Sequence, residues 1–155
     1  MANIIPEQIH IVSIQVTNAN VSMTKGNELL EKNKAFDITF NSNTSLSLED
    51  KEFCKIDFTV GFLPAEQLKD QTDFSASFSI DFVFSIENLE NFKVQVPGVE
   101  HGFLLDSTLG ITLMGIVYST ARGIILTRTA GTVLDSILLP VINPANLLVI
   151  QETNK

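Results

Sequence analysis

The side chains that could do chemistry are few in this sequence and lie far apart. It has two histidines, His10 and His101, and a single cysteine, Cys54. A metal site needs clustered His, Cys or carboxylate ligands, and a catalytic cysteine needs a histidine and a third group brought beside it by the fold. The HExxH, CxxC and GxSxG motifs and the glycine-rich phosphate loop do not occur. We therefore expect a protein that is not an enzyme, with no catalytic residue, no metal and no cofactor.

The same residues have plainer structural interpretations. His10 falls on a predicted strand, and His101 follows the Pro97-Gly98 break, which is typical of a loop. Carboxylates are scattered, and their spacing assigns no pair of them to one site. A lone cysteine excludes an internal disulfide and is typical of a reducing compartment. Because the first residues also lack the features of a signal peptide, we expect a cytoplasmic protein.

Length and composition favour one folded domain over residues 1–155. Of these residues, 45% are hydrophobic and only 18% are charged, which is too apolar for a disordered chain. The formal net charge is −8, so the backbone of DNA or RNA would be repelled, and nucleic acid is not an expected partner. The acidic surface is consistent with attraction of basic partners and equally with solubility.

Four segments are predicted as strands, the first from its Ile and Val content and the others from apolar alternation with a period of two. In the fourth segment every even position from Phe74 to Ile86 is apolar, and four of these positions are phenylalanine. Such a face needs a large apolar cover. The four strands are expected at residues 9–16, 35–40, 53–63 and 72–86. The connections are expected to be a long loop at 17–34, with room for one helical turn at 27–32, and a polar segment at 41–52.

Residues 107–128 lose this alternation and contain no proline, which predicts a long helix. Asp106 or Ser107 can cap its start, and Gly131 lies just past its end. Its apolar residues point in nearly all directions around the axis, whereas an amphipathic surface helix has one apolar stripe. Both sides of this helix should therefore be buried.

A membrane or protein on both sides could bury such a helix. Residues 109–126 just reach the lower limit of a membrane span. However, Arg122 would cost about 2.5–3.5 kcal/mol even on the gentlest insertion scale, and the strands would lose their cover. We expect no membrane insertion and instead place the helix between its own sheet and another subunit.

The end of the chain completes the predicted architecture. Residues 132–142 are expected to be extended, and Asn143 followed by Pro144 predicts the start of a short last helix. The four strands in sequence favour a mostly antiparallel sheet. The predicted fold class is thus α+β, a four-stranded antiparallel sheet followed by a long helix and a short C-terminal helix.

Two features of the long helix bear on assembly. Gly115, Ser119 and Gly123 form a line of small residues that would let another backbone approach closely, either in a subunit contact or in tight packing on the helix's own sheet. Arg122 must be paired or must reach water. We assign it a structural ion pair or carbonyl contact between helix and sheet, with a partner contact as the alternative.

Short motifs occur in a fixed order in the second half of the chain. They are Phe84-Ser85-Ile86, residues 118–125 with the pair Ala121-Arg122, Gly131-Thr132, and Leu139-Pro140-Val141-Ile142-Asn143. Their order and spacing resemble those of the SecB protein-export chaperone family. Together with the predicted order of strands and helices, the resemblance covers about residues 8–150.

The resemblance implies a SecB-like fold and a function. The family is a homotetramer, a dimer of dimers, with its long helices sandwiched between two sheets. It binds unfolded polypeptides in apolar grooves without nucleotide hydrolysis and hands them to the SecA motor. On this basis Phe36, Ile38 and Phe40 would line the client-binding groove, and Gly115, Ser119 and Gly123 would lie in the oligomer interface. Ordinary core positions are the alternative for the three apolar residues.

This sequence also departs from the family. The acidic positions through which the family docks its motor correspond here to uncharged residues, Asn18, Ser22, Ser75 and Ser77. The chain ends at Lys155, so the longer last helix and the tail that contacts the motor are expected to be shorter or missing. A client-specific chaperone, such as the guardian of an antitoxin, and a structural or interaction subunit without chaperone activity are therefore the alternatives to a chaperone for export.

Overall fold

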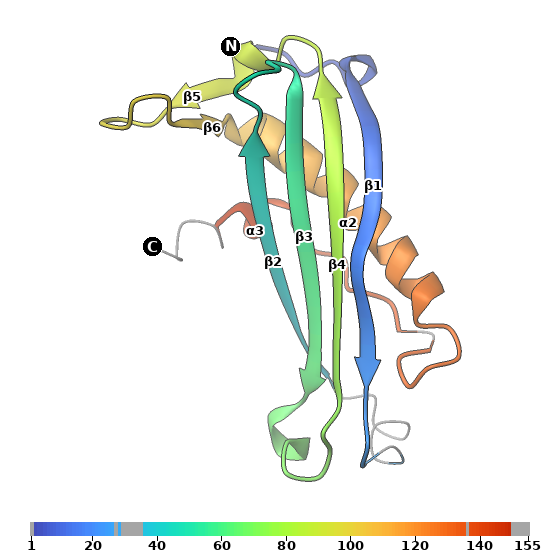
Figure 1. Cartoon of the computed structure of the whole chain (residues 1–155). Helices are drawn as coiled ribbons and strands as arrows, with labels where there is room; N and C mark the ends of the chain where they lie inside the picture. Colours follow the sequence, from blue (N-terminus) through green and yellow to red (C-terminus); the bar gives the residue numbers. More distant parts are fainter. Residues whose placement is uncertain (1, 27, 29–35, 136, 150–155) are drawn as a thin grey trace.

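The computed structural model describes residues 2–26, 28, 36–135 and 137–149. It has two layers, a four-stranded sheet and a long helix that runs obliquely across one face of that sheet (Figure 1). A small two-stranded hairpin projects to one side. The strands and helices are β1 Ile9–Ser22, β2 Phe36–Leu46, β3 Phe53–Pro64, β4 Ser75–Ile86, β5 Lys93–Gln95, β6 Phe103–Leu105, α2 Ser107–Arg128 and α3 Ala145–Val149. Short 3-10 turns are η1 Pro6–Gln8, η2 Glu66–Leu68 and η3 Leu89–Phe92.

The sheet is antiparallel throughout, with the strand order β1-β4-β3-β2. Strands β2, β3 and β4 follow one another as neighbours, and β1 lies beside β4, as in a Greek key. The connection from β1 to β2 therefore crosses from one edge of the sheet to the other. The predicted fold class is confirmed, and β1 and β2 are its two edge strands.

Two strands are longer than the sequence predicted. The loop expected from residue 17 is wrong for its first part, because β1 continues to Ser22, which pairs with Ser75. The polar connection expected from residue 41 is likewise wrong at its start, because β2 continues to Leu46 opposite Cys54. Asn, Ser and Thr have weak strand propensity alone, and pairing with a neighbouring strand overrides it. The helical turn considered at 27–32 falls almost entirely outside the described residues.

Two further differences lie around the long helix. The hairpin of β5 and β6 was not predicted, since strands of three residues leave no clear periodicity. Residues 132–135 form turns rather than the extended chain that was expected there. The boundaries of the long helix, in contrast, are those predicted, from Ser107 to Arg128.

The inner face of the sheet forms the core. All seven even-numbered side chains of the fourth predicted strand are buried, and the inward side chains of β3 join them. The largest buried side chains are Phe58, Phe62, Phe74, Phe78, Phe82 and Phe84. The odd-numbered positions of β4 lie on the opposite, outer face and remain partly exposed.

Local signals define both ends of α2. The carboxylate of Asp106 accepts a hydrogen bond from the backbone N–H of Thr108 at 2.9 Å, which caps the first turn. Gly131 follows the helix with φ +77°, a conformation that favours glycine. The sheet-facing side chains are buried and include Leu109, Leu113, Val117, Ala121 and Ile125.

The sheet covers one side of α2 only. Ile111 and Leu126, on its other side, are 36% and 38% exposed. By length and composition this helix could cross a membrane, with a mean hydropathy of 1.6, but 44% of that stretch is already buried inside the protein. This chain's own sheet thus leaves the apolar outer side of the helix exposed.

Replacing Phe82 by alanine tests which face is the core. Phe82 is fully buried on β4, whereas its neighbour Val83 lies on the outer face. We expect Phe82→Ala to lower the free energy of unfolding by about 3–5 kcal/mol and Val83→Ala to lower it by less than about 1 kcal/mol. Urea denaturation measures both, and equal losses would contradict the assigned faces.

Candidate functional site

Phe36, Ile38 and Phe40 form a column of inward-facing side chains on the edge strand β2, here called the β2 column. All three are half-buried. The ring of Phe36 lies 5.1 Å from that of Phe74, and the ring of Phe40 lies 5.6 Å from that of Tyr118. The column therefore touches the core and keeps part of its apolar surface open at the sheet edge. It combines features of the two interpretations, groove and core, that the sequence left open.

Tyr118 connects the β2 column to the segment after α2. Its hydroxyl donates a hydrogen bond of 2.6 Å to the carbonyl oxygen of Pro140, and burial raises the pKa of this phenol. Leu139 is buried, but its neighbours Leu138 and Val141 are 61% and 86% exposed. Further apolar surface is thus presented on the same connecting segment.

The short helix α3 covers the middle of β2. Asn143 Oδ1 accepts a hydrogen bond of 3.1 Å from the backbone N–H of Ala145, so the predicted N-cap is confirmed. Ser42 Oγ donates to the carbonyl oxygen of Leu147 at 3.3 Å, and Leu147 is buried. This docking separates the β2 column from Leu46 at the end of the strand.

The line of small residues on α2 does not serve tight packing on the sheet. Ser119 and Gly123 are exposed, and a Cβ added to Gly123 would meet no atom within 4 Å. At Gly115 an added Cβ would lie 3.7 Å from the ring of Pro144, which is an ordinary contact. Between α2 and β1, a shallow groove of about 460 Å³ is lined by Ile14, Val16, Thr120, Gly123, Ile124, Thr127 and Arg128.

Arg122 lacks the contact that was expected of it. It is half-buried on α2, and its Nε is buried with no hydrogen-bond partner among the described residues. None of the ion pairs in the described part of the chain includes it. A buried N–H without an acceptor costs about 1–3 kcal/mol. A contact with a partner, the alternative interpretation, stays a prediction.

The residues suited to catalysis are held apart. Within the described residues, no group of three or more His, Cys, Asp or Glu side chains could hold a metal ion. His10 Nε2 lies 3.4 Å from a carboxylate oxygen of Glu87 on the surface, and His101 lies in the turn before β6. Burial raises the pKa of the Cys54 thiol to about 12, so almost no thiolate forms at neutral pH.

The carboxylates are less scattered than the sequence suggested. Asp57 on β3 pairs directly with Asp81 on β4 on the outer face. Two like charges in this position repel one another. Lys55 Nζ lies 2.9 Å from Asp57 Oδ1 and 3.1 Å from Asp81 Oδ2, and these hydrogen bonds raise the pKa of Lys55. The two acids were visible as outward positions, but only the strand register brings them together.

The four uncharged positions that correspond to the family's motor contacts meet on the outer face. Ser22 pairs with Ser75 and the next outward pair includes Ser77. Asn18 Nδ2 donates to Ser77 Oγ at 2.7 Å. The structure therefore gathers Asn18, Ser22, Ser75 and Ser77 into one neutral, internally hydrogen-bonded patch.

Asp73 fastens the start of the β1–β2 connection. Its Oδ1 accepts hydrogen bonds from the backbone N–H groups of Lys25, at 2.9 Å, and Thr24, at 2.8 Å, and its Oδ2 accepts from the Thr24 hydroxyl. These bonds favour the charged form and lower the pKa of this carboxyl. Asp73 immediately precedes Phe74, whose ring contacts Phe36 of the β2 column.

Comparison with known proteins adds a likeness of fold. No family model matches the sequence, and no curated protein matches it significantly. The chain is similar to a Mycobacterium tuberculosis SecB-like chaperone, Rv1957, solved in complex with a ChAD peptide from the HigA1 antitoxin. Identity is 11% over 88% of this chain and 91% of that chain, with a TM-score of 0.60. A Streptococcus agalactiae protein of unknown function has 14% identity over 86% of this chain and 97% of that one, with a TM-score of 0.48.

The likeness to the mycobacterial chaperone shows that this chain has a SecB-like α+β fold. The antiparallel sheet, the long helix on one face and the short C-terminal helix are the shared parts. This confirms the fold that the motifs around Arg122 and Pro140 implied. At 11% identity the likeness concerns the fold alone.

Replacing Asp73 by asparagine should destabilise the protein in a pH-dependent manner. A carboxyl with a lower pKa in the folded state contributes stability above its unfolded pKa, about 3.9. That contribution is lost as the pH falls through the folded value. We therefore expect Asp73→Asn to be less stable than the parent chain at pH 7, with the difference shrinking towards pH 3.

Urea midpoints measured across this range provide the comparison. Asp70→Asn, at an exposed position in the preceding turn, is the matched control. Its difference in stability from the parent chain should not shrink towards pH 3. The same pH dependence of the urea midpoint in both variants would contradict the role assigned to the hydrogen bonds of Asp73.

Proposed function

We propose that this protein is an ATP-independent chaperone that binds unfolded or non-native polypeptides. The observation that carries the proposal is the β2 column, which leaves apolar surface half-open along an edge strand of a SecB-like fold. Extended, apolar segments of a client would pack against this surface. The acidic net charge of −8 supports clients with basic residues beside those segments.

Binding of a specific client is favoured over general export. The mycobacterial SecB-like chaperone was solved with a peptide from an antitoxin, which supports the idea that this fold can serve one dedicated client. The neutral patch at Asn18 and Ser77 lacks the acidic groups that would attract a basic docking site on a motor. We therefore propose a client-specific chaperone that acts in the cytoplasm without handover to SecA.

We further propose that the protein assembles as a homotetramer, a dimer of dimers. The apolar outer side of α2, its small residues Ser119 and Gly123, and the unpartnered Nε of Arg122 all support a protein contact on this side. The edge strand β1 adds a second surface, because Ile11, Val12 and Ile14 are exposed beside its unpaired backbone. Long edge strands without charged side chains readily pair with another strand.

A structural or interaction subunit without chaperone activity is the rival function. Suppression of aggregation separates the two. The purified chain, added in stoichiometric excess to a chemically unfolded test protein that aggregates on dilution, should reduce light scattering without ATP. Undiminished scattering would remove the chaperone function and leave the rival.

Replacing Ile38 by asparagine should weaken client binding. Ile38 is half-buried in the β2 column, so the change removes apolar contact area and places an amide where the client would pack. We expect the Kd for an unfolded client to rise about tenfold, which corresponds to about 1.4 kcal/mol. Fluorescence anisotropy with a labelled, unfolded client measures this change.

The neighbouring residue supplies the matched control. Thr39→Asn makes a similar amide on the same strand, but Thr39 points to the outer face. Its Kd should equal that of the parent chain. A similar rise in Kd for both variants would show that the outer face, or overall stability, determines client binding.

Replacing Gly123 by leucine should dissociate the oligomer without harming the subunit. A Cβ added at Gly123 meets no atom within 4 Å, and leucine favours a helix by up to about 1 kcal/mol relative to glycine. We expect light scattering to report a smaller mass and thermal unfolding of the subunit to be intact. Gly123→Ala is the conservative control and should retain more of the oligomer, whereas an unchanged mass for Gly123→Leu would remove this helix face from the interface.

A further inference from the structure

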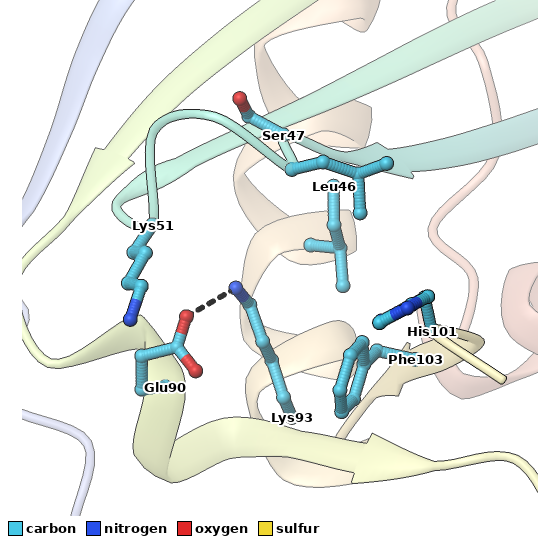
Figure 2. A pocket seen from close by; sticks show the side chains of 8 residues that line it. Leu46, Ser47, Lys51, Glu90, Lys93, His101 and Phe103 are labelled. Carbon is cyan, nitrogen blue, oxygen red and sulfur yellow. Dashed lines mark hydrogen bonds and ion pairs between the residues drawn. The ribbon is translucent and has the colours of Figure 1, made fainter.

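A pocket of about 550 Å³ lies at the far end of β2 from the β2 column. Figure 2 shows it from close by, between the β2–β3 turn and the β5–β6 hairpin. Leu46, which ends β2, belongs to the same inward-facing set of positions as Phe36, Ile38 and Phe40. The six residue steps from Phe40 to Leu46 span roughly 20 Å of extended chain.

The pocket has an apolar wall. Leu46 contributes from the end of β2, Leu48 from the β2–β3 turn and Phe103 from β6. Figure 2 shows Leu46 and Phe103 lining the same pocket. Leu48 is 79% exposed and Phe103 is 41% exposed. One large apolar side chain from another molecule would therefore find partners on two sides.

Basic groups outnumber acidic groups in the lining. Lys93 Nζ lies 2.5 Å from a carboxylate oxygen of Glu90, and its side chain is only 9% exposed. The hydrogen bond from Lys93 lowers the pKa of Glu90, and the charge of Lys51 acts in the same direction. Two ammonium groups and one carboxylate leave one positive charge in excess, in a chain whose net charge is −8.

His101 adds a donor or acceptor at the rim. It lies in the turn between β5 and β6 with φ +63°, a backbone conformation that most side chains avoid. In Figure 2 its ring lies beside that of Phe103. The turn thus places an imidazole at the pocket, at a position whose backbone conformation glycine would adopt more readily.

We propose that this pocket binds the C-terminal residue of a polypeptide, with its α-carboxylate near Lys51 and Lys93 and its apolar side chain on Leu46, Leu48 and Phe103. The inference rests on the proposed function, since the ligand is the end of a client chain. In a terminal leucine or phenylalanine, the carboxylate and the apolar group leave the same Cα. Both can therefore reach a lysine and the apolar wall within one pocket of this size.

The charge balance favours a carboxylate over a phosphate. The lining's single excess positive charge matches a monoanion, whereas a phosphate dianion would remain half unmatched beside Glu90. No arginine, the side chain that matches phosphate in a two-pronged contact, lines the pocket. The exposed acids Glu49, Asp50 and Glu100 in the two flanking turns also disfavour a highly charged ligand.

Matched peptides test the proposal. Three labelled twelve-residue peptides share an apolar sequence: the first ends in leucine as a free acid, and the second ends in leucine amide. The third ends in glutamate amide, so its only carboxylate is on a side chain. We expect fluorescence anisotropy at physiological salt to show at least fivefold tighter binding of the free acid than of either amide.

Three variants locate the effect. Lys93→Gln and Lys51→Gln should abolish the preference for the free acid. Lys69→Gln is the matched control, because Lys69 also pairs with a glutamate three residues earlier beside a 3-10 turn, but it lies outside the pocket. Lys69→Gln should keep the full preference for the free-acid peptide over the amides. Lys51 is exposed and forms no ion pair in the described part of the chain, so its variant tests the pocket even if Lys93→Gln impairs folding.

The outcomes separate this inference from the proposed function. If the free acid and the leucine amide bind equally well, the pocket inference fails and the chaperone function stands. If no peptide binds, the chaperone function fails and the inference fails with it. Equal binding of the glutamate amide and the free acid would assign the pocket to side-chain carboxylates instead. Displacement of the free-acid peptide by millimolar inorganic phosphate would make the pocket a general anion site. Equal binding of the glutamate amide, or displacement by phosphate, would overturn the proposal.

Discussion

The phenylalanine-rich inner face of the sheet needs an apolar cover, and the rest of the structure depends on how that cover is supplied. Phe74 and the three phenylalanines of β4 gain stability only when water is excluded from all of them. The helix α2 supplies this exclusion across β3 and β4. The helix runs obliquely across that face of the sheet (Figure 1).

The cover is incomplete in two places, and both carry the proposed functions. A single helix shields the central strands better than the edges, so Phe36, Ile38 and Phe40 on β2 stay half-open. The helix that shields the sheet also has apolar residues on its other side, where Ile111 and Leu126 are exposed. A client surface and an assembly surface thus arise from the same packing constraint.

The charged side chains of the described residues organise surfaces of this fold. Lys55 joins Asp57 and Asp81 on the outer face, Asp73 holds the start of a connection, and Lys93 holds Glu90 at the rim of a pocket. Each of these carboxylates lies beside a cation or accepts hydrogen bonds from backbone donors. Burial keeps the Cys54 thiol protonated at neutral pH.

The sequence by itself determined the elements whose signals are local. The alternation in β3 and β4 decided which side chains face inward, and Asp106 and Gly131 marked the limits of α2, because period and capping depend on residues a few positions apart. Only the tertiary structure decided the ends of β1 and β2, whose Ser and Asn residues become strand through pairing with neighbouring strands. It also decided that Asp57 faces Asp81 and that Leu46, Lys93 and His101 share a pocket, since strand register and chain crossing bring together segments with no local relation in the sequence.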